Sequence, residues 1–294
     1  MSDLFTATTA AQVEAALAKG DNIEREKEWI GMTPLVSACE RGVLEVVDCL
    51  LNHGADPHHR SKMFKSALQM ASWEGYAAIV ERLVRAGADI NDNSASETSS
   101  LGLAARQGHV DVVDCLLSHG ADTEVEDSAS KTALMWASEK GNVDVVDRLL
   151  AAGCNVHALD DKGITALILA ARADRVPIID RLVVHGADFN HQNKEGENAL
   201  MWAARQGRVE AVYRLLSLGC DVNVQNRDGW TTLMMACSAG KINVVRLLLD
   251  HGADPLLCNK DGRRAIDLTS SPEIQTLLNG LILLSFHHHH HHAP

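Results

Sequence analysis

Residues 226–258 read NRDGWTTLMMACSAGKINVVRLLLDHGADPLLC, and this stretch decides the fold. Asn226–Gly229 has the composition of a turn, and Thr231 is suited to cap a helix that starts directly after it. Gly240 interrupts this helix, and apolar residues at helical spacing over Ile242–Leu249 predict a second one. The stretch therefore predicts a turn followed by two helices.

The same pattern recurs along the chain every 33 residues. A glycine ends each second helix, and a leucine stands near the start of each first helix. A fixed period of this size indicates an array of supersecondary units, each of which buries its apolar face against its neighbours. The glycines are Gly54, Gly87, Gly120, Gly153, Gly186, Gly219 and Gly252, and the leucines are Leu35, Leu68, Leu101, Leu134, Leu167, Leu200 and Leu233.

The unit resembles the ankyrin repeat, whose pattern is Asp-x-x-Gly-x-Thr-Pro-Leu-x-x-Ala-Ala, then Gly, a Val-Val-x-x-Leu-Leu helix and Gly-Ala-Asp. The start is complete at Thr33-Pro34-Leu35, and the glycine between the helices is replaced in the fifth repeat by Asp174. Aspartate tolerates a left-handed backbone better than most residues do. The resemblance implies an all-α ankyrin-repeat solenoid of helix-turn-helix repeats, with β-hairpin or turn fingers and a concave groove.

The period also divides the chain into domains. Residues 1–27 are expected to form an N-terminal capping half-repeat and residues 259–286 a C-terminal capping repeat, because solenoids need caps. Residues 287–294 are expected to be a purification tag, and the apolar residues 281–286 to end the capping helix, with a docking segment or a truncated junction as alternatives. The seven full repeats between the caps are 28–60, 61–93, 94–126, 127–159, 160–192, 193–225 and 226–258.

Composition favours a binding module over an enzyme. The chain of 294 residues is 46% hydrophobic but only 4% aromatic, as expected where small aliphatic residues fill thin layers of helices. We find no Gly-rich phosphate loop, nucleophile elbow or catalytic dyad outside the repeat register. We expect no enzymatic activity, cofactor, metal or small-molecule substrate. Without a secretory segment or a long apolar run, a soluble, monomeric protein of the cytoplasm is expected, with the nucleus as the alternative.

Charge is unevenly distributed. Residues 1–150 contain 24 Asp and Glu against 13 Lys and Arg, so most of the net charge of −12 lies in the first half. A nucleic-acid partner needs a basic stripe, and this chain offers the opposite. One acidic residue per second helix forms a column that predicts a solvated outer face, with attraction of a basic partner as the alternative. The column is Asp48, Glu81, Asp114, Asp147 and Asp180.

Cysteine and histidine follow the repeat register too. Six of the seven cysteines fall in pairs at equivalent positions, which predicts small structural residues in a reducing compartment. Cys258, in a loop, is the exception and a candidate reactive thiol. A histidine precedes the final glycine in four repeats, where the resemblance implies hydrogen bonds to neighbouring backbone. The adjacent His58 and His59 offer two metal ligands without a third. The four capping histidines are His53, His119, His185 and His251.

The resemblance places partner binding on the finger tips and on the exposed side of the first helices. Large aromatic and methionine side chains there bury much area on binding and are suited to be hot spots. We therefore expect a protein or an extended peptide as the partner, held by an adaptor, scaffold or inhibitor. The candidate residues are Trp29, Ile30, Met32, Met63, Phe64, Lys65, Trp73, Arg106, Met135, Glu139, Ile164, Met201, Arg205, Trp230 and Met234.

Three fingers depart from the pattern. The tip glycine, kept for example as Gly163, becomes Phe64, Glu97 and Ser130 at the starts of repeats two to four. These fingers are expected to adopt other turn conformations, because the usual turn depends on glycine. The aromatic and methionine residues near the first two make repeats one and two the favoured contact site. The alternative is that these tips have drifted without function.

Trp136 and Trp202 occupy a first-helix position that is expected to pack inward. Some histone-lysine methyltransferases hold methyl-lysine in an ankyrin cage of Trp and Glu, and Trp136 and Glu139 match two cage positions. Leu169 and Lys131 stand where that family has further tryptophans. A reader of basic or methyl-lysine tails is therefore an alternative function. A structural spacer within a larger protein is a further one.

Overall fold

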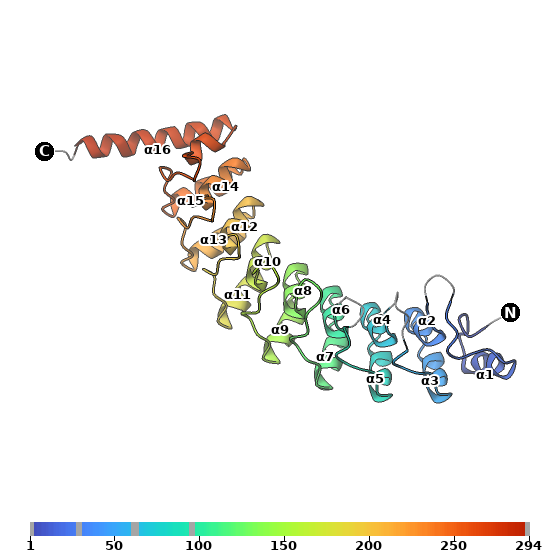
Figure 1. Ribbon diagram of the computed structural model, residues 1–294. Coiled ribbons are helices and arrows are strands. Elements are labelled where there is room, and N and C mark those ends of the chain that lie inside the picture. The colour runs from blue at the N-terminus through green and yellow to red at the C-terminus, as the bar shows by residue number, and fades with distance from the viewer. Residues whose placement is uncertain (1–2, 28–30, 60–64, 94–97, 292–294) are drawn as a thin grey trace. The chain divides into compact units, whose positions relative to one another are not determined.

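The computed structural model describes residues 3–27, 31–59, 65–93 and 98–291 (Figure 1). The chain divides into two compact units, Met1–Asn155 and Val156–Pro294. Within the described residues both units are built from short helices, and the only ladder contact is an isolated bridge between Gln225 and Thr231. The predicted all-α solenoid class is confirmed.

The first unit begins with one helix and continues with four helix pairs, one pair in each predicted repeat. The first helix of each pair packs on the second and, within the unit, on the first helix of the next pair, so the core is a row of thin layers. The helices are α1 (Ala10–Ala18), α2 (Pro34–Arg41), α3 (Leu44–Asn52), α4 (Ala67–Glu74), α5 (Ala77–Arg85), α6 (Ser100–Gln107), α7 (Val110–Ser118), α8 (Ala133–Lys140) and α9 (Val143–Ala151).

The second unit contains three further pairs followed by a short 3-10 helix and a long α-helix. Its final helix, α16, continues through His291, into the residues expected to be a tag. Residues 281–286 are helical as expected, but Leu283, Leu284 and Phe286 are about two-thirds exposed, so the packed part of the helix is the earlier turns with Ile274 and Leu278. The elements are α10 (Ala166–Arg172), α11 (Val176–Val184), α12 (Ala199–Arg205), α13 (Val209–Ser217), α14 (Thr232–Ser238), α15 (Ile242–Asp250), η1 (Ala265–Leu268) and α16 (Pro272–His291).

Each first helix starts at a side-chain cap. The residue before the helix accepts a hydrogen bond from the backbone amide three residues on, which satisfies one of the amides that a helix start leaves unpaired. Six of the seven caps are the serine or threonine of the repeat pattern, and Asn198 takes the same role before α12. The caps are Thr33, Ser66, Ser99, Thr132, Thr165, Asn198 and Thr231.

Consecutive repeats are joined at the glycine between the helices. A Cβ atom on Gly42 would lie 2.6 Å from the ring of Tyr76, and one on Gly75 would lie 2.6 Å from the ring of His109. The covering residue comes 34 positions later, and His109 Nε2 also donates a hydrogen bond to the carbonyl of Trp73, in the preceding repeat, at 2.8 Å. We call these covering side chains the link residues. The glycine is therefore needed for space as well as for its left-handed backbone.

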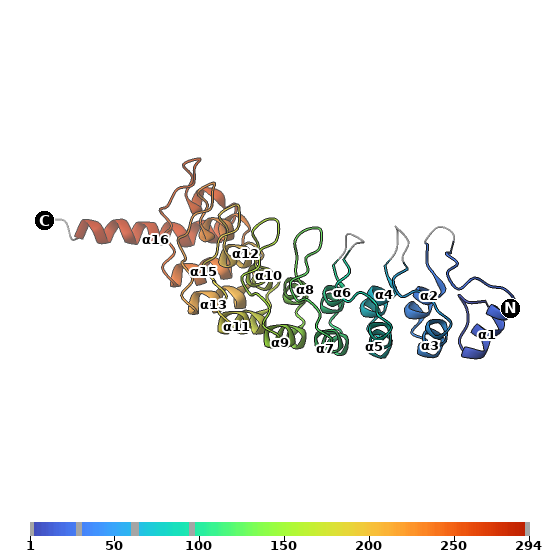
Figure 2. The same ribbon diagram turned by 60° about the horizontal axis from the view of Figure 1, so that its bottom comes forward.

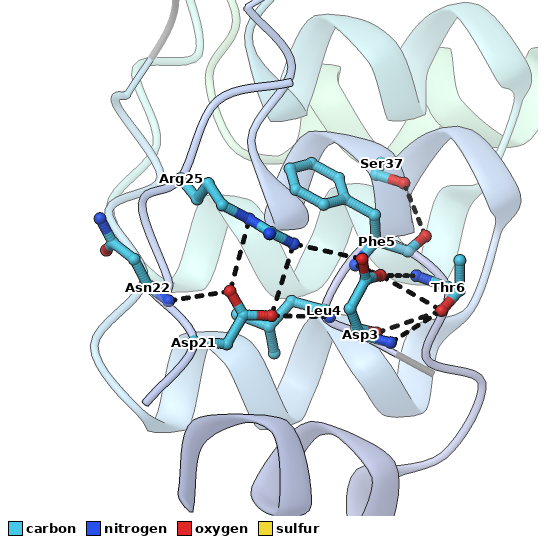
Figure 3. Close-up of polar contacts among 8 residues, drawn as sticks. All are labelled: Asp3, Leu4, Phe5, Thr6, Asp21, Asn22, Arg25 and Ser37. Atoms are coloured by element: carbon cyan, nitrogen blue, oxygen red, sulfur yellow. Dashed lines mark hydrogen bonds and ion pairs between the residues drawn. The ribbon is translucent and has the colours of Figure 1, made fainter. Parts of the chain in front are cut away.

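The N-terminal cap uses residues that the repeat pattern did not reveal (Figure 3). Leu4 and Phe5 are buried, as is Val13 of α1. Asp3 holds the turn that brings them inward, since its carboxylate accepts from the amide of Phe5 at 2.9 Å. Arg25 closes the cluster with hydrogen bonds to Asp3 and Asp21. A short folded segment thus takes the place of a missing first helix.

The fingers that the structure describes in full, from residue 127 onward, are turns (Figure 2). Gly163 and the equivalent Ser130 both have a positive φ, 75° and 62°, and both donate to the carbonyl three residues earlier. The expectation that the fourth repeat abandons the glycine-type turn is therefore wrong. The Asp127 carboxylate accepts from the amides of Ala129 and Lys131, which holds this finger without the glycine. Phe64 and Glu97 lie outside the described residues. Asp174 has a φ of 60°, as its tolerance of the left-handed region predicted.

Candidate partner-binding surface

The first helices expose a narrower stripe than the sequence suggested. Met135, Met201 and Met234 are at most 1% exposed, so the expectation that they face a partner is wrong. Their repeat position points into the contacts between neighbouring repeats, and the equivalent Gln69 and Ile168 are buried too. Each first helix has packed neighbours on several sides, which leaves only one stripe accessible.

The finger residues divide in the same way. Met32 and Ile164 are buried, which contradicts their assignment to an exposed tip, because this position leads directly into the capped helix start. Lys65 and Trp230 at the same position are half-buried. The predicted contact residues Trp29, Ile30, Met63 and Phe64 lie outside the described residues.

Trp136 and Trp202 are half-buried, so the expectation that they are core residues is also wrong. They are one helical step from the buried methionines and reach the accessible stripe. Each indole donates a hydrogen bond to a finger carboxylate: Trp136 to Asp127 at 3.1 Å, and Trp202 to Glu197 at 3.2 Å. Each hydrogen bond fixes the indole ring at its N–H edge, and part of each ring remains exposed to solvent.

In the first unit, aromatic and cationic side chains from three successive first helices stack on one another. The Arg106 guanidinium of α6 lies 5.6 Å from the ring centre of Trp73 on α4 and 4.4 Å from that of Trp136 on α8. Lys65 lies 5.3 Å from the Trp73 ring centre, and Lys131 lies 4.6 Å from that of Trp136. We call these five residues the Trp–Arg stack.

The stack is positively charged within an acidic chain. Its Lys131 forms an ion pair with Glu139 at 3.7 Å, but Arg106 pairs with no carboxylate among the described residues. A guanidinium presents its donors in one plane and pairs well with carboxylates while it stacks on aromatic rings. The sequence predicted Trp73, Arg106 and Lys65 as contact residues, but it did not predict that they stack on one another, because the residues of the stack come from three different repeats.

The second unit presents a different arrangement. Arg172 lies 5.4 Å from the ring centre of Trp202, and Arg205 forms an ion pair with Glu197. A hollow of about 350 Å³ beside this pair is lined in part by Trp230. Arg205, the cation that lines this hollow, is already paired with a carboxylate, so the hollow has less to offer a charged partner than the Trp–Arg stack has.

The Trp–Arg stack weakens the methyl-lysine hypothesis. A methyl-lysine cage needs aromatic faces that are open to an incoming cation. Arg106 and Lys131 of the protein already lie over Trp136, and Lys131 is the ion-pair partner of Glu139. The two cage positions that matched in sequence are therefore engaged within the chain.

The capping histidines do not all behave alike. His185 and His251 each donate a hydrogen bond from Nδ1 to the carbonyl four residues earlier, at 2.9 Å, so their predicted contact with backbone is confirmed. His119 instead lies 2.6 Å from a Glu81 carboxylate oxygen, and His53 faces Glu14 at 3.9 Å. Backbone capping is thus wrong for these two.

The cysteines are structural where they are enclosed. Cys39, Cys49, Cys220 and Cys237 are buried, and Cys258 alone is exposed. Burial raises the pKa of the Cys237 thiol to about 12, so this thiol stays protonated and unreactive at neutral pH.

The comparisons with known proteins agree with this architecture. The helix pairs define a repeat solenoid, and a family model for ankyrin repeats in three copies matches residues 7–94, 68–160, 144–226 and 209–271. The chain therefore belongs to the ankyrin-repeat family. Within the described residues no helix is long and apolar enough to cross a membrane.

Individual relatives are similar over short stretches or in fold. The human DNA-binding protein RFXANK is 44% identical over 64 residues, which cover 22% of this chain and 25% of the relative. The mouse 2-5A-dependent ribonuclease is 41% identical over 51 residues, 17% of this chain and 7% of the relative. The solved ankyrin-repeat domain of Bcl-3, a member of the IkappaB protein family, has 26% identity and a TM-score of 0.65, covering 73% of this chain and 98% of that one. The chain thus spans a quarter or less of the two curated relatives.

Proposed function

We propose that this protein is a non-enzymatic interaction module that binds an extended, acidic segment of a protein partner at the Trp–Arg stack. The fold supports the general role, because ankyrin repeats are interaction domains. The observation that carries the specific role is Arg106, which two indoles hold in place. As an adaptor or scaffold of this kind, it would act in the cytoplasm or the nucleus.

The stack has the chemistry of a hot spot. Trp and Arg are the residues that most often dominate binding energy, and fixed rings lose little freedom when a partner binds. A carboxylate that reaches Arg106 would gain a paired, partly desolvated contact, and apolar side chains beside it would cover Trp73 and Trp136. Neighbouring Lys65 and Lys131 extend the positive region along the stripe.

The proposal is tested with peptides, because the partner need not be known. A random peptide library is selected on the immobilised full-length chain, and the enriched peptides are synthesised and measured by fluorescence anisotropy. We expect acidic peptides with apolar residues, whose affinity falls about tenfold or more in Arg106→Gln. Their affinity should also weaken as salt is raised.

The matched control is Arg172→Gln, which removes the equivalent arginine from Trp202 in the second unit and should leave affinity unchanged. Enrichment of basic peptides, or equal binding by Arg106→Gln, would contradict the proposal. Tighter binding of a trimethyl-lysine peptide than of its unmodified form would favour the tail reader. A library that yields no binder would favour the spacer.

A further inference from the structure

The second helices form a regular series of contacts on the side of each unit away from the first helices. An acidic residue of one second helix meets the residue 34 positions later in the next, and we call each such meeting a slot. In three slots the later residue is an arginine that forms an ion pair with the acid. The pairs are Asp48 with Arg82 at 2.9 Å, Asp114 with Arg148 at 3.0 Å, and Asp180 with Arg214 at 2.5 Å.

The slot between α5 and α7 departs from this series. Glu81 supplies the acid, but Cys115 stands where the neighbouring slots have arginine. His119, at the end of α7, turns toward the same carboxylate; the Arg82 and Arg148 slots have Ala86 and Ala152 at its position. The slot has thus exchanged a guanidinium for a thiol and an imidazole.

These three groups converge on one point. The Cys115 thiol donates to Glu81 Oε2 at 3.1 Å, and His119 Nε2 lies 2.6 Å from the same oxygen. All three ligand atoms lie within 4.8 Å of one another. Ligand atoms around a tetrahedral zinc ion lie about 3.5 Å apart. The other carboxylate oxygen of Glu81 is held by Arg85 at 2.9 Å, which orients Oε2 toward the thiol and imidazole.

We propose that Glu81, Cys115 and His119 bind a zinc ion. Thiolate, imidazole and carboxylate are the ligands that zinc takes in proteins, and three of them with one open position for water complete a tetrahedron. The thiol proton leaves to solvent as the zinc–sulfur bond forms. His119 is about a third exposed, so the ion can enter from solvent. The ion would supply the positive charge that arginine supplies in the neighbouring slots.

A related cluster at the N-terminal cap provides a comparison. Cys49 and His53 repeat the spacing of Cys115 and His119, and Glu14 of α1 supplies a carboxylate. Its histidine is 3.9 Å from the carboxylate, and the Cys49 thiol is directed at the Ala10 carbonyl at 3.7 Å. The groups are less closely gathered, so we assign the ion to the Cys115 slot.

The test uses the full-length chain in which the histidines of residues 287–292 are replaced by serine, because a histidine tail would itself bind metal. Cys49→Ser is added to remove the second cluster. Cobalt is titrated as a spectroscopic substitute for zinc, under reducing conditions. We expect one equivalent to give thiolate-to-cobalt charge-transfer absorption, which zinc then abolishes by displacement.

Ligand variants decide the assignment. Cys115→Ser should abolish the absorption, and His119→Gln and Glu81→Gln should each weaken cobalt binding at least about tenfold. The double variant Cys115→Arg, His119→Ala gives this slot the same residues as the neighbouring slots. The variant protein should therefore remain folded, as judged by circular dichroism, but should not bind metal. His185→Gln and Cys154→Ser are controls that should bind as the parent does.

A second readout is stability. Zinc should raise the melting temperature of the parent but not that of the Cys115→Arg, His119→Ala variant, since only the folded parent gathers the three ligands. Absence of charge-transfer absorption in the parent would overturn the proposal, as would absorption that survives Cys115→Ser. Either result would mean that the three groups form a hydrogen-bonded contact only.

Discussion

At the scale of single residues, one step along a helix separates the core from the surface. Met135 is 1% exposed, while the next residue, Trp136, is held by Asp127 and carries Arg106 over its ring. Successive residues of a helix point about 100° apart, so a reading that is wrong by one position exchanges core for contact surface. The pair therefore offers a direct test of the assignment.

Met135→Ala is expected to lower the free energy of unfolding by about 2–5 kcal/mol, because it leaves a cavity between packed repeats. Urea unfolding followed by circular dichroism measures the change. Lys140→Ala on the exposed end of the same helix is the control, with an expected change within about 0.5 kcal/mol. Equal losses in both variants would show that Met135 is not a core residue.

A second residue-scale prediction concerns pH. His59 lies 2.8 Å from Glu26 and 2.9 Å from Glu24, and it ties the N-terminal cap to the first repeat. The hydrogen bond that His59 donates to the Glu26 carboxylate is the main cause that raises the pKa of His59. Burial opposes it, and the charge of Glu24 adds to the rise. A raised pKa in the folded protein means that the contact stabilises fully below the ordinary histidine pKa of about 6.5.

That stabilisation should disappear as pH rises through the raised pKa of His59. Hydrogen exchange of residues 20–27, corrected for the intrinsic effect of pH, should show greater protection at pH 6 than at pH 8.5. His59→Gln should remove the difference, whereas His58→Gln should preserve it. Protection that is independent of pH in the parent would contradict the role given to His59.

At the scale of elements, the fingers show how a turn survives the loss of its glycine. Ser130 keeps a left-handed backbone because the Asp127 carboxylate gathers the amides of the turn around it. A residue with a Cβ atom in that region costs about 1–2 kcal/mol relative to glycine. The backbone of this finger is thus strained at Ser130, and the hydrogen bonds to Asp127 hold it in place.

Ser130→Gly is expected to raise the free energy of unfolding of the first unit by up to about 1 kcal/mol, after the greater freedom of the unfolded chain is subtracted. The reverse change, Gly163→Ser, should destabilise the second unit, because a Cβ atom there would lie 3.2 Å from the Lys194 amide nitrogen. Hydrogen exchange that resolves the two units measures both. A loss of stability in Ser130→Gly would contradict the strain.

The elements also show what sequence could and could not predict. Caps, helix pairs and inter-helix glycines repeat every 33 residues, so their positions follow from one unit. The Trp–Arg stack joins Trp73, Arg106 and Trp136 from three different repeats, and no single repeat contains it. Trp73 and Arg106 occupy the same repeat position, whereas Trp136 occupies another. Leu4 and Phe5 of the cap lie outside the period altogether. The zinc cluster had a signal, cysteine and histidine four residues apart on one helix, which is visible only when an acid of the preceding repeat is added.

At the scale of the whole molecule, the two units differ in charge more than in fold. The first 150 residues carry 24 acidic and 13 basic side chains, whereas the rest are nearly balanced. Like charges within a Debye length of one another repel, and salt screens that repulsion. The ion pairs between repeats are exposed and contribute little against it.

Sodium chloride raised from low concentration to about 0.5 M is therefore expected to slow hydrogen exchange in residues 3–155 more than in residues 156–286. The comparison is internal, since both units share one sample. Sodium sulfate is unsuitable as the salt, because it also strengthens apolar burial. Equal protection of both units would mean that self-repulsion does not limit the stability of the first.

The link residues have a consequence for inheritance. Repeats two and three each carry both a covered glycine of their own and the side chain that covers the glycine of the repeat before, as Tyr76 covers Gly42 and His109 covers Gly75. An insertion or deletion of 33 codons keeps each link residue paired with a glycine, whereas an insertion or deletion of another length breaks this pairing. We therefore expect the number of repeats to vary in evolution more readily than the length of the repeat.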